Sequence, residues 1–405
     1  MLQLKNFSRN LYVTSVASLL TDISTEMVVY VLPLFLAGVL RTPIAAIGLI
    51  EGVAEMTASL TRLLSGQLAD RFNRKWLAVS GYALSAIAKA WLPFVNTWPA
   101  AFAARFADRL GKGIRTAPRD ALIAASVNEQ RRGAAFGFHR AADTLGAFIG
   151  VGLSALIITQ LQGANTALTG ATFTAIALLS VVPAALGVMV LAVGLVEPAR
   201  VAPTHAGRFN ALIWDSLPRR LKVFLLVMAL FTLGNSADAF IVLRAESLGA
   251  SPVMVLLFVL AFNFTYTVAA APLGALSDRI GRRKPILMGW VLYAAIYLGF
   301  ALSNSLAMLG VLWCAYGAYY ALTEGTYKAL IADIAPANQH GLAYGAFHAT
   351  VALMVLPASL LAGLLWQALG AAAPFVVGAA LALTAAALFA ALLRDPEAQP
   401  APEHV

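Results

Sequence analysis

The chain has 405 residues, of which 60% are hydrophobic and only 12% are charged, and its formal net charge is +9. A chain with so few polar residues cannot cover a water-soluble globule of this size, so the composition excludes an ordinary soluble domain. The single cysteine, Cys314, excludes a disulfide framework and a cysteine-based metal site.

Apolar stretches follow one another along almost the whole sequence. A transmembrane helix needs about 20 predominantly apolar residues, and twelve stretches meet that length. We therefore expect an all-α polytopic membrane protein with twelve transmembrane helices. The first six are expected at about residues 11–38, 45–66, 76–95, 98–121, 134–160 and 168–195. The second six are expected at about residues 222–245, 253–276, 285–303, 306–331, 341–368 and 373–393.

The basic residues of the connecting loops are distributed unevenly. With twelve spans, 17 Lys and Arg residues fall on one side of the membrane, against only Arg41 and Arg244 on the other. Cytoplasmic loops carry the excess of positive charge, so we expect both termini in the cytoplasm and the protein in a bacterial cytoplasmic (inner) membrane. The first apolar stretch is too long for a signal-peptide core, so we expect it to be retained. The same rule explains the net positive charge without a nucleic-acid partner.

The sequence repeats itself after 208 residues. This shift places Gly66, Leu68, Asp70, Arg71 and Arg74 on Gly274, Leu276, Asp278, Arg279 and Arg282. The same shift aligns residues 120–137 with 328–345, and one constant shift in two separate segments indicates an internal duplication. We expect two six-helix halves, 1–195 and 222–405, joined by a polar cytoplasmic linker at 196–221. Parallel repeats of this kind, with the substrate site between them, are one of the recurring transporter architectures.

The loop GQLADRFNRK at 66–75 resembles the signature of the major facilitator superfamily, Gly-x-Leu-x-Asp-Arg-x-Gly-Arg-Lys. Asn73 replaces the second glycine of that pattern, which the second copy keeps as Gly281. In the fourth span, Arg105 and Phe106 begin a second pattern of the family, in which Arg109 occupies the place of a glycine. The resemblance, closest to bacterial drug:proton antiporters, implies a secondary transporter that works by alternating access. It implies neither an enzyme nor a cofactor.

The two loop motifs are expected to act as a gate. A carboxylate there can cap a neighbouring helix N-terminus and pair with a guanidinium, which would hold the halves together on the cytoplasmic side in one conformation. The alternative is that these are ordinary charges of cytoplasmic loops. The proposed gate residues are Gly66, Asp70, Arg71, Arg74, Lys75, Gly274, Asp278, Arg279 and Arg282.

The fourth span carries the highest density of charge. At about 100° per residue, its charged residues fall within an arc of roughly 140°. The members of this stripe are Arg105, Asp108, Arg109, Lys112, Arg115, Arg119 and Asp120. We expect Arg105, Asp108, Arg109 and Lys112 to face a substrate cavity, where a positive stripe suits an anionic or zwitterionic solute. The alternative is a network of ion pairs that closes the helix bundle without touching substrate.

Asp22 and Glu26 lie four residues apart on one face of the first span. Two carboxylates this close in a medium of low dielectric do not both ionise readily. One of them is therefore expected to hold a proton near neutral pH and to couple proton movement to transport. The alternative is that each simply pairs with a base of the fourth span.

Further polar residues of the spans are candidates for the substrate cavity. Most belong to the second half, where Glu324 and Lys328, four residues apart, are expected to pair. The candidates are Glu55, Asp238, Asn263, Tyr266, Tyr320 and Glu324. The isolated histidines, His139 and His348, are interpreted as packing residues, and no metal site is expected.

No catalytic constellation or phosphate-binding glycine loop occurs, so transport must be driven by a gradient. The favoured interpretation is a monomeric, proton-coupled exporter of a small organic solute, whose partners are the solute, protons and the lipid bilayer. The first alternative is an importer of an anionic or metal-chelate solute of the siderophore kind. A non-transporting membrane sensor is the second alternative, although the linker is too short to form a signalling domain.

Overall fold

A computed structural model describes residues 8–127, 132–162, 167–197, 214, 217–336 and 339–393, and most of the expected linker lies outside these ranges. All regular structure in these ranges is helical. The first group comprises α1 Arg9–Val29, α2 Val31–Leu34, η2 Phe35–Val39, α3 Ile44–Arg71, α4 Arg74–Trp91, η3 Leu92–Phe94, α5 Trp98–Ala125, α6 Arg132–Gln162 and α7 Gly170–Gly194. The second group comprises α9 Arg219–Gly234, α10 Ala239–Ser247, α11 Pro252–Ile280, α12 Arg283–Leu302, α13 Leu306–Ile334, α14 His340–Leu369 and α15 Ala373–Leu392.

Among the described residues, eleven helical segments are long and apolar enough to cross a membrane. The twelfth expected span is α5, a continuous helix of 28 residues that carries the seven charged residues of the stripe. The prediction of an all-α protein with twelve long helical segments is therefore confirmed. The first segment is divided into α1, α2 and η2, and the seventh into α9 and α10.

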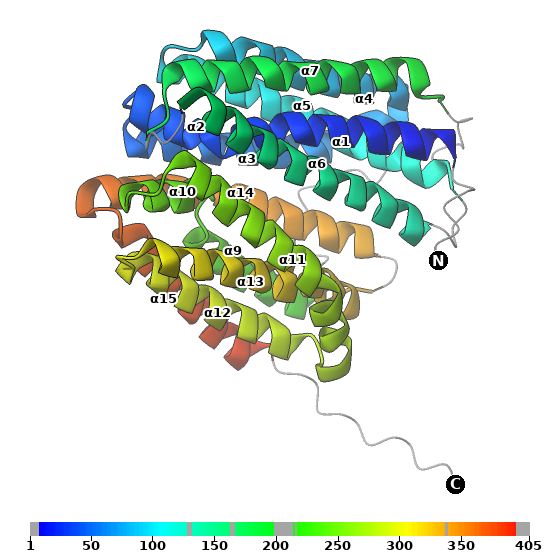
Figure 1. Cartoon of the computed structure of the whole chain (residues 1–405). Coiled ribbons are helices and arrows are strands. Elements are labelled where there is room, and N and C mark those ends of the chain that lie inside the picture. Colours follow the sequence, from blue (N-terminus) through cyan, green and yellow to red (C-terminus); the bar gives the residue numbers. More distant parts are fainter. Residues whose placement is uncertain are drawn as a thin grey trace.

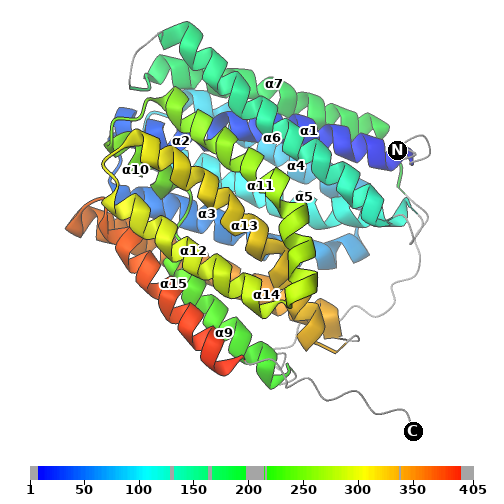
Figure 2. The ribbon, with the colours of Figure 1, turned by 60° about the horizontal axis from the view of Figure 1, so that its bottom comes forward.

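The helices form two groups that lie side by side (Figure 1). In the first group, α1 packs on α6 and α7, and α5 packs on α3 and α4. In the second group, α13 packs on α11 and α12, and α15 packs on α9 and α12. The main contacts between the groups join α3 to α14 and α6 to α11, and α6 and α11 run beside each other in Figure 2. The two groups therefore correspond to the two expected six-helix halves.

The two halves touch backbone to backbone where α3 crosses α14. A Cβ atom added to Gly48 would lie 2.3 Å from the carbonyl oxygen of Ser359, and one added to Gly363 would lie 2.8 Å from the Cα of Ala45. Only glycine permits such an approach. We call this end of the molecule, where α3 begins, the closed end.

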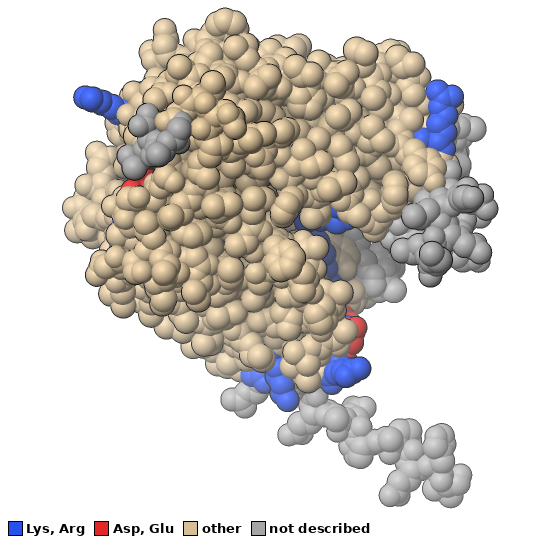
Figure 3. All heavy atoms as spheres, viewed as in Figure 1, with Lys and Arg blue, Asp and Glu red and all other residues tan. Residues whose placement is uncertain are grey.

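The opposite end, called here the basic end, carries the start of α1 and the two loop motifs. Glycines near this end have free space around them, since no atom lies within 4 Å of a Cβ built on Gly137, Gly274 or Gly345. The space-filling view shows a hollow between the halves with basic side chains in it (Figure 3). The halves therefore meet at the closed end and separate toward the basic end.

Arg244 joins two helices at the closed end. Its guanidinium donates hydrogen bonds to the carbonyl oxygens of Phe300 (2.9 Å), Ala301 (3.1 Å) and Ser303 (3.0 Å). The last carbonyls of a helix have no partner within the helix, so this side chain satisfies the end of α12. The sequence had identified Arg244 only as one of the few basic residues on its side of the membrane.

The α3–α14 crossing gives a first prediction. Gly363→Ala places a methyl group against the backbone of Ala45, so the closed end must open and the apparent melting temperature should fall by several degrees. A cysteine introduced at Thr42, which is buried, should at the same time become more reactive toward maleimide in a Cys314→Ser background.

Gly345→Ala, on the same helix, is the matched control. Its added methyl group meets open space, so the helix propensity of alanine should leave stability unchanged or raise it by about 1 kcal/mol. Equal labelling of Thr42→Cys in the two variants would show that the crossing does not hold the closed end.

Candidate functional site

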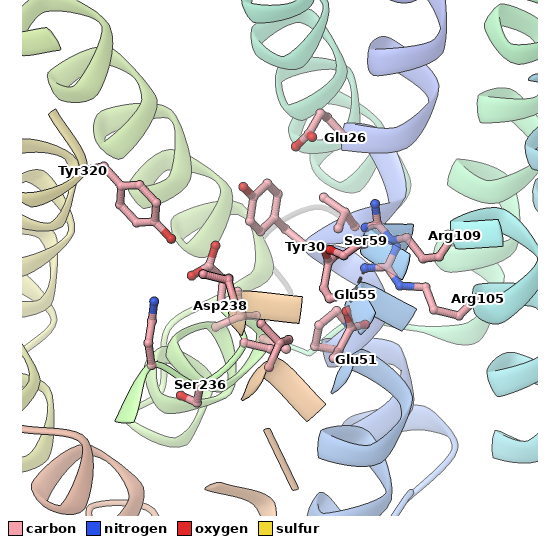
Figure 4. Close-up of a pocket in the computed structure, with 18 residues that line it drawn as sticks. Glu26, Tyr30, Glu51, Glu55, Ser59, Arg105, Arg109, Ser236, Asp238 and Tyr320 are labelled. Carbon is pink, nitrogen blue, oxygen red and sulfur yellow. Dashed lines mark hydrogen bonds and ion pairs between the residues drawn. The ribbon is translucent and has the colours of Figure 1, made fainter. Parts of the chain in front are cut away.

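A central cavity of about 350 Å³ lies between the halves and is called here the inner cavity. The first half contributes the α1–α2 junction, α3 and α5, and the second half contributes the α9–α10 junction, α13 and α14. Figure 4 shows the polar side chains converging from both sides. The polar residues that line it are Glu26, Tyr30, Glu51, Glu55, Ser59, Arg105, Arg109, Asn235, Ser236, Asp238 and Tyr320.

A second, wider cavity of about 640 Å³ adjoins the inner one, and Glu26 lines both. Its walls come from α1, α3, α5 and α6 of the first half and from α11 and α13 of the second. The predicted site residues that line it are Asp22, Glu26, Lys112, Asn263, Tyr266 and Glu324. The further titratable residues are Arg62, Arg115, Arg119, Asp120, His139, Arg140, Asp143 and Lys328.

Two arginines of α5 pair with two glutamates of α3. Arg105 Nη2 lies 2.7 Å from Glu51 Oε2, and Arg109 Nε lies 3.4 Å from Glu55 Oε1. Glu51 and Glu55 are four residues apart, as are Arg105 and Arg109, so matching faces of two adjacent helices form two parallel pairs. Pairing of this kind offsets part of the cost of placing charge within a membrane.

Asp108 occupies a different position from its neighbours in the stripe. It lines a small pocket between α1, α4 and α5, and it is absent from the residues that line either larger cavity. Its carboxylate lies 3.9 Å from Arg105 and interacts with Lys89, whose Nζ donates a 2.8 Å hydrogen bond to Thr25. Asp108 therefore belongs to a buried network that ties α5 to α4 and α1.

The helix breaks of the first and seventh spans both open onto the inner cavity. The breaks include Tyr30 and Asp238, which are 208 residues apart and so occupy equivalent places in the repeat. In the first span, Pro33 has no N–H to donate to the carbonyl of Val29 four residues earlier. Val29 and Pro33 both line the inner cavity.

Tyrosines of the second half hold the break between α9 and α10. The Tyr293 hydroxyl donates to the carbonyl oxygen of Gly234 (3.0 Å) and lies 3.2 Å from Asn235 Oδ1. The Tyr316 hydroxyl donates to Asp238 Oδ1 (3.0 Å). These contacts fix the unwound segment and direct Asp238 toward the cavity.

The other predicted residues of the second half surround Glu324. Its carboxylate accepts a 2.6 Å hydrogen bond from Tyr266 and lies 3.4 Å from Lys328 Nζ, so the predicted pairing with Lys328 is confirmed. Arg140 of α6 interacts with Tyr266 and Glu324 from the opposite half. Asn263 donates to the carbonyl oxygen of Val259, one turn earlier on α11 (3.1 Å).

In the first loop motif, the N-terminus of α4 is capped by a residue that the sequence did not identify. The carboxylate of Glu197, beyond the end of α7, accepts hydrogen bonds from the backbone N–H groups of Arg74 (3.2 Å) and Lys75 (2.8 Å). Asn73 adds a side-chain cap by accepting from the N–H of Trp76 (3.0 Å). The side chains of Asp70 and Arg71 lie outside the described part of the structure.

The second loop motif is arranged differently. Arg282 pairs with Asp278 and with Asp333 at the end of α13 (3.3 Å), so these charges join elements of one half. Gly281, at the place of Asn73 in the repeat, has φ +83° and takes the chain through the left-handed region. The ion pairs of Arg282 therefore lie within the second half in this conformation, in which the basic end is open.

The paired arginines give a second prediction. Arg109→Ala should leave the carboxylate of Glu55 without its partner and destabilise the protein, by less than the roughly 3–5 kcal/mol that breaking a fully buried pair costs, because the Glu55 side chain is 41% exposed. Adding Glu55→Ala should restore most of that stability, because neither charge then remains unpaired. Thermal unfolding in detergent measures both effects.

Transport assays of the same variants separate a structural from a functional role of Arg109. If the double variant transports at the full rate, Arg109 is only a counter-ion of Glu55. If stability returns while transport does not, the pair also takes part in binding the solute or in transferring the proton.

Comparisons with known proteins agree with this architecture. The family model described as Major Facilitator Superfamily matches residues 14–243 and 223–404. An uncharacterized MFS-type transporter of Methanocaldococcus jannaschii is 34% identical over 387 residues, which cover 94% of each chain. The tetracenomycin C resistance and export protein of Streptomyces glaucescens is 26% identical over 212 residues, 51% of this chain and 38% of that protein.

Solved structures share the fold at low sequence identity. A variant of the nucleoside transporter NupG superposes with a TM-score of 0.78 at 14% identity, covering 95% of this chain and 100% of that one. A bacterial homolog of the human lysosomal transporter Spinster gives a TM-score of 0.76 at 14% identity, with 94% and 95% covered. With the family model matching along nearly the whole sequence, the chain belongs to the major facilitator superfamily of membrane transporters.

Proposed function

We propose that this transporter is a proton-coupled exporter of a small organic solute. The observation that carries the proposal is the position of Asp22 and Glu26, because both face the wide cavity and Glu26 also faces the inner one. Among the described residues, neither carboxylate forms an ion pair with a base, and Lys112 is their neighbour on α5. Glu26 thus lies between the two cavities, where a solute has to pass.

The chemistry of these carboxylates suits proton exchange. Two acids four residues apart on α1 repel each other when both are ionised in a medium of low dielectric, so binding one proton relieves the repulsion. A nearby solute charge or the Lys112 ammonium can replace that proton. A group that exchanges a proton for another charge during the cycle is what coupling requires.

The proposed orientation places the basic end in the cytoplasm. The loops at this end carry Arg74, Lys75, Arg282 and Arg283, and the positive-inside rule assigns such loops to the cytoplasm. The conformation described here would then be open to the cytoplasm, as expected for an exporter that is ready to receive solute. The relative from Streptomyces glaucescens, which is named as an export protein, also favours this direction.

An importer of an anionic or metal-chelate solute is the second candidate. It is favoured by the basic residues of the wide cavity, which outnumber the acidic ones: Arg62, Lys112, Arg115, Arg119, Arg140 and Lys328 against Asp22, Glu26, Asp120, Asp143 and Glu324. Accumulation of a solute in cells distinguishes the candidates. Adding a protonophore should raise accumulation if the protein exports the solute and lower it if the protein imports it.

The coupling role is tested by neutralising each acid. In proteoliposomes, Asp22→Asn or Glu26→Gln should abolish transport driven by a pH gradient while leaving exchange down a solute gradient. Glu246→Gln is the control, because Glu246 lies on α10, outside both cavities. If both single variants and the double variant keep pH-driven transport, α1 does not carry the coupled proton.

The loop motifs are proposed to close the basic end in the other conformation. Asp70→Asn should remove an anchor worth about 1–3 kcal/mol from that conformation alone and shift the population further toward the one that is open at the basic end. Cysteine labelling at the two ends measures the shift, and Asp278→Asn tests the second copy. Unchanged labelling at both ends would contradict the gate role and leave the motif charges as ordinary charges of cytoplasmic loops.

A further inference from the structure

The charges that line the inner cavity do not balance. Two arginines face it, and each is already paired with a glutamate of α3. Two carboxylates remain, Glu26 from the first half and Asp238 from the second. The basic stripe of α5 therefore presents little free positive charge to this cavity, and its unpaired bases line the wide cavity instead.

Asp238 is the more isolated of the two carboxylates. It accepts the 3.0 Å hydrogen bond from Tyr316, and the charged groups that interact with it, Glu55 and Glu51, are both acidic. No described base forms an ion pair with it. An ionised carboxylate without a counter-charge has a high free-energy cost at this depth. Asp238 would therefore be stabilised by a cation from outside the chain or by a proton.

A second carboxylate of the same cavity, that of Glu51, is hydrogen-bonded through only one of its two oxygens among the described residues. Glu51 is only 5% exposed, and its Oε1 atom has no hydrogen-bond partner among the described residues, whereas Oε2 binds Arg105. Glu51 lines the inner cavity together with Asp238. Oε1 of Glu51 is itself enclosed by protein, so the carboxylate that a molecule in the cavity can reach on this side is that of Asp238.

The remaining wall is aromatic and aliphatic. Tyr320 and Asp238 enter the cavity from the second half, and Tyr30 enters from the first, between the carboxylates (Figure 4). Val242, Val351 and Val355 complete the lining. A volume of about 350 Å³ is at the lower end of the range for small-molecule sites, and aromatic faces attract cations.

We propose that the inner cavity binds an organic cation, a protonated amine with an aromatic or aliphatic body, whose ammonium group is held by Asp238. The assignment rests on the proposed function, since it names the class of solute for that transporter. Asp238 belongs to the second half and the coupling acids belong to the first, so a bound cation would contact both halves. The anionic solute expected from the α5 stripe alone is disfavoured in this cavity, because Glu51 and Glu55 already neutralise its bases.

Binding of three ligands with the same ring tests the assignment. Phenethylamine is cationic, phenethyl alcohol is neutral and hydrocinnamate is anionic near neutral pH. Calorimetry on the whole purified protein in detergent should give a dissociation constant for the amine at least about tenfold below that of either analogue. The assignment is overturned if the anion or the alcohol binds as tightly, or if none of the three binds at millimolar concentration.

Two variants on one segment of the chain locate the site. Asp238→Asn should weaken binding of the amine by about tenfold or more and leave binding of the alcohol unchanged. Glu246→Gln is the matched control, because Glu246 lies on α10 outside both cavities and its loss should not affect the amine. Asp238→Asn loses no ion pair, so its melting temperature should not fall, which separates a binding defect from a folding defect.

This experiment is independent of the proton-coupling proposal. It needs no gradient, so selective amine binding at Asp238 without pH-driven transport would retain the site and overturn the coupling. Conversely, pH-driven transport of an anionic solute that is insensitive to Asp238→Asn would retain the coupling and overturn the site.

Discussion

The cost of placing charge in a hydrocarbon layer governs how the first half is built. The helix α5 carries seven charged residues along a span that most membrane proteins fill with apolar ones. Glu51 and Glu55 of α3 offset its arginines, and Lys89 of α4 interacts with its Asp108. Each of these partners comes from a neighbouring helix. The pairing that lowers the cost of placing α5 in a membrane therefore also fixes how the helices of the first half pack.

The charges that are not offset in this way line the two cavities, where we propose that the solute and the proton bind. Asp22, Glu26 and Lys112 of the first half and Asp238 of the second line the cavities and form no ion pair among the described residues. The helix interruptions at Tyr30 and Asp238 lie at equivalent places in the repeat, and irregular backbone is tolerated in a membrane only where it lines a cavity or is buried in protein. The glycine contacts of α3 and α14 close one end of this region, and the hollow of the basic end leaves the other open.

Much of the fold was predictable, because the length of the apolar spans and the 208-residue repeat can both be read along the sequence without knowledge of tertiary contacts. The stripe of α5 and the Glu324–Lys328 pair also followed from helical spacing. Partners on different helices did not, since the sequence allowed Asp22 and Glu26 to pair with bases of the fourth span, whereas Arg109 pairs with Glu55 of α3. The capping of α4 by Glu197 and the anchoring of the α9–α10 break by Tyr293 depend on tertiary packing, for which no local sequence pattern exists.

The central claim is that the two halves enclose two adjoining cavities that are open at the basic end while the α3–α14 crossing closes the other end. Spin labels at two pairs of exposed, repeat-related positions test it most directly: Trp76 with Lys284 at the basic end, and Asn96 with Asn304 at the closed end. Pulsed electron–electron double resonance gives the distance distribution for each pair. Across several pH values, and with an organic cation added, the basic-end distance should shorten as the closed-end distance lengthens. Distances that stay fixed under all conditions, or that change in the same direction at both ends, would contradict the account.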